Sequence, residues 1–211
     1  MKLVQIKGSN GSGKTTIVKQ MLELDPDAYY LEYDGMIIAT VMPTVRWIAV
    51  GKYDLESKMG GCDRLSSVDK VKDAIDRSLD WACELSDMEP MYGIVYEGMM
   101  ISTIKTTFYD YAVLMASRYD VDPLFVILSA SPKGCMHRIQ DRGTARKDLN
   151  HDNVANKCLM VRRHALTYDP ELVRWMDVER IPEAYMLQAF AALVGDHDLV
   201  ARLVIGADWG E

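Results

Sequence analysis

Eight residues near the amino terminus have the types and the spacing that hold a polyphosphate. Residues 8–15, GSNGSGKT, match the pattern G-x-x-x-x-G-K-[ST] without substitution. Glycines let successive backbone N–H groups turn toward phosphate oxygens, the lysine reaches the terminal phosphates, and the last hydroxyl binds Mg²⁺. The residues expected to hold the nucleotide are Gly8, Asn10, Gly11, Ser12, Gly13, Lys14, Thr15 and Thr16.

The residues around this motif predict the elements that such a loop requires. Residues 1–7 form a short apolar strand pattern that stops at Gly8, and residues 15–24 have the apolar spacing of a helix. Residues 28–33 predict a second strand, which ends at Asp34. The order strand, glycine-rich loop, helix, strand is the setting in which a phosphate loop functions.

Strands and helices alternate along the rest of the chain. Further strands are expected at 93–96, 124–128 and 172–176, and helices at 66–82, 102–117, 131–142, 151–168 and 182–194, whereas 198–205 fits either. This alternation predicts an α/β fold with a five-stranded parallel sheet between two helical layers. We expect one domain over 1–211, with a small insertion at 36–66 that includes a possible strand at 45–50, and a lid at about 138–150.

Two carboxylates follow predicted strands. Asp34 comes after the second strand and Glu97 after the third. The carboxyl ends of parallel strands lie on the side of the phosphate loop, so we expect Asp34 to act as the base for an acceptor hydroxyl. Glu97 is expected to support Mg²⁺ or the acceptor. The alternatives are a helix-capping or turn-forming role for Asp34 and a solvated strand-end carboxylate for Glu97.

The charge is unevenly distributed. The chain carries −7 in total, which taken alone opposes binding to nucleic acid, but residues 133–163 hold eight bases and three acids. That segment carries +5 and the other 180 residues carry −12. Within it, Arg138 and Arg142 share a helix face and Arg146 follows Gly143, so we expect these arginines to close over the transferred group. A solvated helix face is the alternative.

The expected insertion mixes aromatic and charged residues. Arg46, Tyr53, Asp63 and Arg64 are candidates for binding the acceptor, because such residues read a base by stacking and hydrogen bonding. The alternative is that they anchor a glycine-rich loop.

Several classes are excluded by what the sequence lacks. No N-K-x-D guanine motif is present, and the nearest matches to an acidic strand end, LEYD and IVYE, suit a small kinase better than a motor ATPase. The four cysteines form no CxxC pair, so we expect reduced thiols. No apolar stretch approaches the ~20 residues of a membrane span, and we expect a cytoplasmic protein without a membrane partner.

Taken together, these segments resemble the P-loop nucleoside and nucleotide kinase superfamily. The runs GKYD, GGCDRL, YEGMMIS and CMHRIQDRGTAR are similar to bacteriophage kinases that act on 5-hydroxymethyluracil in DNA during thymine hypermodification. The resemblance implies transfer of the γ-phosphoryl of ATP, with Mg²⁺, to the hydroxymethyl group of modified DNA, in the host cytoplasm if the chain is phage-encoded. Polynucleotide 5′-hydroxyl kinases also use an aspartate after the second strand, which supports the role of Asp34 by analogy.

Two other functions stay open at this point. A deoxynucleoside monophosphate kinase would phosphorylate a free nucleotide, although thymidylate kinases carry Asp-Arg where this chain has Glu97-Gly98. A regulatory ATP-binding module would bind the nucleotide and turn it over slowly.

Overall fold

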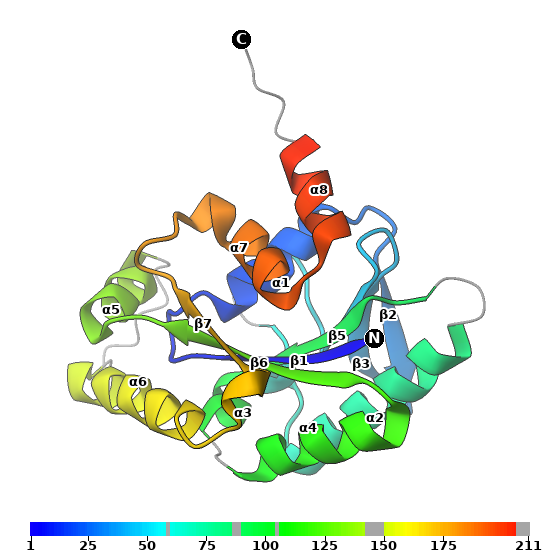
Figure 1. The fold of residues 1–211 in the computed structure, drawn as a ribbon, viewed down its shortest axis with the longest axis horizontal. Coiled ribbons are helices and arrows are strands. Elements are labelled where there is room, and N and C mark those ends of the chain that lie inside the picture. The colour runs from blue at the N-terminus through cyan, green and yellow to red at the C-terminus, as the bar shows by residue number, and fades with distance from the viewer. Residues whose placement is uncertain (58–59, 86–89, 104–105, 142–149, 206–211) are drawn as a thin grey trace.

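A seven-stranded sheet runs through the molecule, with helices on both faces (Figure 1). The computed structural model describes residues 1–211 except 58–59, 86–89, 104–105, 142–149 and 206–211. The strands are β1 (Lys2–Lys7), β2 (Tyr29–Tyr33), β3 (Met36–Met42), β4 (Trp47–Val50), β5 (Gly93–Glu97), β6 (Asp122–Ser129) and β7 (Val173–Asp177). The α-helices are α1 (Lys14–Glu23), α2 (Val68–Leu85), α3 (Met99–Thr103), α4 (Thr106–Tyr119), α5 (Pro132–Asp141), α6 (His151–Ala165), α7 (Met186–Val194) and α8 (His197–Ile205). Three short 3₁₀ helices cover Cys62–Arg64, Pro170–Leu172 and Glu183–Tyr185.

The strand order is β2-β3-β4-β5-β1-β6-β7. Strands β4, β5, β1, β6 and β7 are parallel, whereas β2 and β3 pair antiparallel with each other and β3 pairs antiparallel with β4. The predicted α/β class and its three layers are confirmed. The sheet has seven strands instead of the predicted five, because two antiparallel strands extend the parallel set.

The second parallel strand is β4, and not residues 28–33 as predicted. Strand β2 pairs with β3 through a two-residue turn, in which Asp34 and Gly35 have φ values of 48° and 71°. Positive φ at both positions is the geometry of the hairpin turn that Asp-Gly favours. The expected insertion at 36–66 therefore supplies β3 and β4, which are strands of the sheet.

Two apolar cores fill the space between the sheet and the helices. On one face, α2, α3, α4 and α6 pack against the sheet, and on the other face α1, α7 and α8 do so (Figure 1). Strand β1 contributes to both, since Leu3 faces the first core and Val4 and Ile6 face the second. Burial on both faces holds β1 rigid, and its last residue precedes the phosphate loop.

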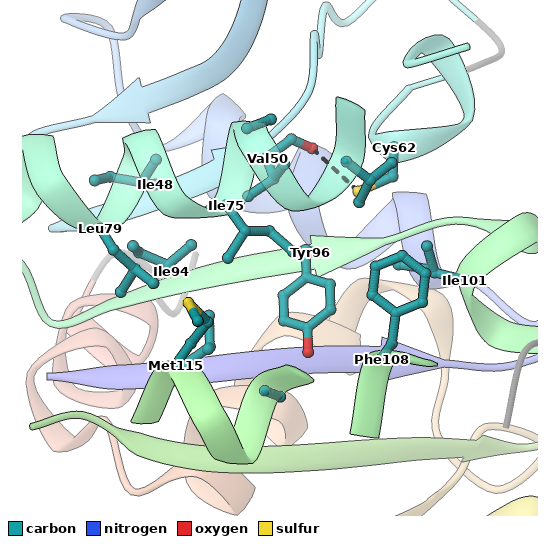
Figure 2. Packing of buried hydrophobic residues seen from close by; sticks show 14 of the residues in the cluster. Ile48, Val50, Cys62, Ile75, Leu79, Ile94, Tyr96, Ile101, Phe108 and Met115 are labelled. Atoms are coloured by element: carbon teal, nitrogen blue, oxygen red, sulfur yellow. Dashed lines mark hydrogen bonds between the residues drawn. The ribbon is translucent and has the colours of Figure 1, made fainter. Parts of the chain in front are cut away.

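The first core also fixes the segment after β4. Figure 2 shows Tyr96 of β5 beside Phe108 of α4, with ring centroids 6.5 Å apart, and Cys62 beside the end of β4. The Cys62 thiol donates to the carbonyl oxygen of Val50 at 3.9 Å. This contact anchors the 3₁₀ helix Cys62–Arg64, and with it the next side chain, Asp63.

Most other element boundaries follow the expectations, but the helix expected at 182–194 begins only at Met186, after the 3₁₀ helix Glu183–Tyr185. The single helix expected at 102–117 is α3 followed by α4, with residues 104–105 outside the described ranges. The tail at 198–205, which fitted either element, is the helix α8. None of the helices in the described ranges combines the length and the apolar character that a bilayer span requires.

Candidate active site

The phosphate-loop motif joins β1 to α1 as the sequence predicts. The loop ends at Gly13, which has a φ of 96°, and α1 begins at Lys14. Gly11 has a φ of 75°, and a Cβ there would lie 2.5 Å from the carbonyl oxygen of Cys135 on α5. The loop therefore needs glycine at this position both for its backbone angle and for its close packing on α5.

Polar groups of the loop point inward. Lys14 is 7% exposed, and its Nζ donates to the carbonyl oxygens of Gly8 and Ser9 at 3.0 Å each. Ser12 Oγ is buried and has no hydrogen-bond partner in the described part of the chain. Asn10 and Thr16 are half-buried at the two ends of the motif. An orphaned hydroxyl and a lysine held on the loop carbonyls suit a site that receives phosphate oxygens.

Glu97 lies directly beside the loop. It ends β5, opposite Ile6 of β1, and it is 1% exposed. Its Oε1 accepts the hydroxyl of Thr15 at 3.0 Å. Burial raises the pKa of Glu97, while Lys14 and the hydrogen bond from Thr15 oppose that increase. The structure thus brings together Lys14, Thr15 and Glu97 at the carboxyl ends of parallel strands, where the sequence predicts that Glu97 lies.

Tyr53 provides a second hydroxyl to the same carboxylate. Its phenol donates to Glu97 Oε1 at 3.0 Å, and the side chain is 1% exposed. Burial, with the neighbouring Glu97 charge, raises the pKa of Tyr53 well above its ordinary value, so the phenol stays a donor. A Cβ at Gly61 would overlap both the Tyr53 hydroxyl and the Glu97 carboxylate. Tyr53, expected to bind the acceptor, instead orients Glu97.

Asp63 lies at the exposed side of this group. Its two carboxylate oxygens accept the backbone N–H of Met99, the first residue of α3, at 2.8 and 2.9 Å. Its charge is close enough to Glu97 to raise the pKa of that carboxyl further. Asp63 is exposed, whereas Glu97 is buried. The site therefore has one enclosed carboxylate, Glu97, which contacts Thr15, and one accessible carboxylate, Asp63, whose charge acts on Glu97.

Comparison with known proteins assigns the family of this site. A family model described as 5-hmdU DNA kinase matches residues 1–174. The chain belongs to the 5-hmdU DNA kinase family. The predicted resemblance to phage kinases of this kind is thereby confirmed.

Two curated relatives of the family come from bacteriophages. The 5-hmdU DNA kinase of Bacillus phage SP10 is 32% identical over 177 residues, which cover 82% of this chain and 26% of the relative. The 5-hmdU DNA kinase 1 of Salmonella phage ViI is 29% identical over 166 residues, which cover 78% of this chain and 69% of the relative. The chain thus aligns with about a quarter of the SP10 relative and about two thirds of the ViI relative.

A solved structure shares the fold. The YorR protein of Bacillus subtilis, in complex with phosphorylated GDP, superposes with a TM-score of 0.54 at 10% identity, over 93% of this chain and 98% of that chain. At this identity the likeness concerns the architecture alone.

Asp34, the predicted base, is not brought to the site in this family member. It lies exposed in the hairpin turn between β2 and β3, at the edge of the sheet. Three strands, β3, β4 and β5, separate β2 from β1. The prediction assumed that residues 28–33 were part of the parallel set, and the antiparallel pairing of β2 removes that basis.

Arg46 lies away from the phosphate loop, and Arg64 is engaged by another carboxylate. Arg46 immediately precedes β4, which runs parallel to β5 and β1, so it lies at the opposite end of the sheet, where its Nε donates to the carbonyl oxygen of Pro90 at 2.9 Å. Arg64 forms an ion pair with Asp54 at 3.2 Å. Neither guanidinium contacts the residues around Glu97 in the contacts described.

The arginines of the predicted lid divide into two groups. Arg138 on α5 donates to the carbonyl oxygens of Gly11 at 3.0 Å and Val178 at 3.3 Å, so it lies against the phosphate loop. Arg142 and Arg146, with most of the expected lid at 138–150, lie outside the described residues. Arg138 therefore contacts the backbone of the phosphate loop directly.

Proposed function

We propose that this chain transfers the γ-phosphoryl group of ATP, with Mg²⁺, to the hydroxymethyl group of 5-hydroxymethyluracil in DNA. The observation that carries this proposal is the convergence of Lys14, Thr15 and Glu97 beside the phosphate loop, in a chain of the 5-hmdU DNA kinase family. The phage origin of the curated relatives supports action in the cytoplasm of an infected host.

The nucleotide end of the site fits a magnesium triphosphate. Thr15 and Glu97 offer oxygen ligands, and the described residues contain no cluster of three or more His, Cys, Asp or Glu side chains that would hold a metal without phosphate. Mg²⁺ usually takes one or two protein ligands and completes its shell with phosphate and water. When bound, it neutralises charge on the β- and γ-phosphates. Lys14 would exchange its two loop carbonyls for phosphate oxygens.

We assign to Asp63 the role of general base for the acceptor hydroxyl. This carboxylate is exposed and is held by the N–H of Met99, so it is available to an incoming hydroxyl and fixed in position. Glu97 is enclosed by Thr15 and Tyr53, which suits a metal ligand better than a base. Asp63 would accept the proton of the hydroxymethyl group as that oxygen attacks the γ-phosphorus in line.

Arginines complete the proposed site. Arg138 lies against Gly11 and would fix the loop around the β-phosphate, and Arg142 and Arg146 are proposed, on their sequence positions, to neutralise the transferred group. A guanidinium over a transferring phosphoryl group contributes orders of magnitude to the rate.

A panel of acceptors tests the proposal. The protein is incubated with γ-labelled ATP and Mg²⁺, together with 5-hydroxymethyluracil DNA, matched thymine DNA, or the free 5-hydroxymethyl-dUMP and dTMP nucleotides. We expect label in the modified DNA, none in thymine DNA and little in the mononucleotides, and none in any arm with Lys14→Ala. Label confined to a mononucleotide would replace the proposal with a nucleoside monophosphate kinase. Binding of ATP without transfer in any arm would indicate a regulatory module.

A further inference from the structure

Two cysteine thiols converge on one hydroxyl of the phosphate loop. Cys135 Sγ lies 3.0 Å from Ser9 Oγ, and Cys158 Sγ lies 3.1 Å from the same oxygen. The three residues come from α5, from α6 and from the loop, and they are brought together by the packing of α5 on α6. Ser9 is 3% exposed and Cys135 is fully buried, so this contact is shielded on the loop side.

Cys158 is also reached from outside. It is half-buried and lines a cavity of about 290 Å³ between α6 and the ends of β6 and β7. Trp175 and Leu159 form apolar walls of this cavity. Asp177 and Glu179 add two carboxylates and Arg162 adds one guanidinium, so the lining keeps a net negative charge. A small molecule with an aliphatic body and a positive charge matches that lining.

The two thiols differ in protonation. The neighbouring Cys135 thiol lowers the pKa of Cys158, the Ser9 hydroxyl adds to this effect, and burial opposes it. The hydrogen bond to Cys158 and burial raise the pKa of Cys135. The two shifts have opposite directions, so Cys158 ionises before Cys135. Because the thiolate is the reactive form, Cys158 is the nucleophile of the pair.

We propose that Cys158 is a covalent modification site for small cationic disulfides that enter this cavity, and that Cys135 resolves the adduct into a Cys135–Cys158 disulfide. In the first step, Cys158 Sγ⁻ attacks one sulfur of the small disulfide, whose S–S bond breaks, and the released thiolate takes a proton from water. In the second step, Cys135 loses its proton to solvent and attacks Cys158 Sγ, displacing the second small thiol. The protein pair is oxidised by two electrons and the small disulfide is reduced to two thiols.

This exchange does not depend on the proposed phosphoryl transfer, since neither sulfur takes part in that reaction. It acts on the loop directly, because Ser9 loses the thiol contacts that hold its hydroxyl. Of the other cysteines, Cys62 is buried and its pKa is raised well above the ordinary value by burial, which keeps it protonated. Cys83 is exposed on α2, far along the chain from the loop, and serves as the reference thiol.

The test uses cystamine as the small disulfide and intact and peptide mass as the readout. We expect the native chain to lose two hydrogens and to give a peptide that links Cys135 to Cys158. Cys135→Ser is expected to stop at one cysteamine on Cys158, Cys158→Ser to leave Cys135 unmodified, and Cys83→Ser to form the same internal disulfide as the native chain. Cysteamine on Cys83 with an unmodified Cys158 would overturn the proposal.

A second measurement needs no variant. The rate at which the free Cys158 thiol disappears in the native chain treated with cystamine is followed against pH by peptide mass. We expect the rate to level off at a lower pH than the rate of an ordinary thiol, because the neighbouring Cys135 lowers the pKa of Cys158. A rate that still climbs steeply above pH 8, as for an ordinary thiol, would contradict the assignment of Cys158 as the nucleophile.

Discussion

Tyr53 donates its phenolic hydroxyl to Glu97 Oε1 across 3.0 Å, inside a region that water does not reach. The same oxygen accepts the hydroxyl of Thr15, so two donors from different parts of the chain fix one carboxylate. A hydrogen bond to a charged group contributes roughly 1.5–3 kcal/mol. Tyr53→Phe should therefore lower kcat/KM by roughly tenfold to a hundredfold and raise the Mg²⁺ concentration needed for half-maximal rate. Tyr33→Phe, at an exposed tyrosine of β2, is the matched control.

Tyr53→Phe should also shift the pH dependence of kcat/KM. The phenol of Tyr53 stabilises the charged form of Glu97 and so lowers its pKa, against the larger increase that burial causes. Removing the phenol raises the pKa of Glu97 again, and the carboxylate then takes up its proton at a higher pH. The acid limb of kcat/KM should move to higher pH in Tyr53→Phe. An unmoved limb would mean that Glu97 does not need to be ionised for the reaction.

Substitution of Asp63 and substitution of Asp34 are expected to have opposite effects on kcat. Asp63→Asn keeps an oxygen that accepts the N–H of Met99 but removes the base, so kcat should fall roughly a hundredfold or more while the melting temperature changes little. Asp34→Asn should leave kcat within about twofold, because Asp34 lies in an exposed turn whose geometry asparagine also adopts. The measurement is the initial rate on 5-hydroxymethyluracil DNA at saturating ATP. The reverse order of effects would restore Asp34 as the base.

Arg138 is expected to act on nucleotide binding through the loop backbone. Arg138→Lys keeps the charge but loses the planar donor pair that reaches Gly11 and Val178. The KM for ATP should rise roughly tenfold, and a direct binding titration with an ATP analogue should show the same loss. A change in kcat alone, with unchanged nucleotide affinity, would instead assign Arg138 to the transferred group.

Lys7 gives the stability of the fold a pH dependence. Its Nζ donates to the Tyr168 hydroxyl at 2.8 Å in the interior, and burial lowers its pKa to about 8 from the ordinary 10.5. Between pH 8 and 10.5, Lys7 is protonated in the unfolded chain but largely deprotonated in the folded chain. Burial of Lys7 therefore destabilises the fold most below pH 8, and this destabilisation decreases to zero as the pH rises to 10.5. The free energy of unfolding should increase by roughly 2 kcal/mol from pH 7.5 to 9.5 relative to Lys7→Met, measured by urea titration. Parallel curves for the two proteins would mean that the pKa of Lys7 is the same in the folded and the unfolded chain.

Binding of DNA should depend on the basic segment. Arg162 and Arg163 are exposed on α6, within the stretch that carries +5. If the two guanidinium groups contact phosphates, replacing both with alanine should reduce the slope of log affinity against log salt by roughly two, since each neutralised phosphate contributes about 0.9. Lys70→Ala on α2 is the control and should leave the slope unchanged. Equal slopes for all three proteins would place the DNA elsewhere.

The phosphate loop and Glu97 could be predicted from the sequence because each is identified by a short run of neighbouring residues. The phosphate loop is one unbroken motif, and Glu97 follows a strand of apolar residues, so their meeting follows from the parallel sheet. The position of Asp34 was misjudged although a local signal existed. Asp-Gly after a strand pattern is a hairpin turn signal, and it indicates that the chain turns back instead of entering a helix.

The remaining contacts join residues far apart in the chain, and no short pattern carries them. Tyr53 and Glu97 are separated by 44 positions, and Ser9 and Cys158 by 149. Whether a tyrosine in a glycine-rich stretch meets a base or a carboxylate depends on how η1, the 3₁₀ helix Cys62–Arg64, packs against α3. The Cys62 thiol contacts the carbonyl oxygen of Val50 at the end of β4 and so positions η1. This contact can be recognised only in the folded structure.

The hairpin formed by β2 and β3 also gives experimental access to the molecule. Its two-residue turn is exposed, it stands at the outer edge of the sheet, and three strands lie between β2 and the phosphate loop. Exposed turns of this kind tolerate added residues. A fluorophore or a short affinity tag inserted between Asp34 and Gly35 would therefore report on or immobilise the protein without disturbing the phosphate loop.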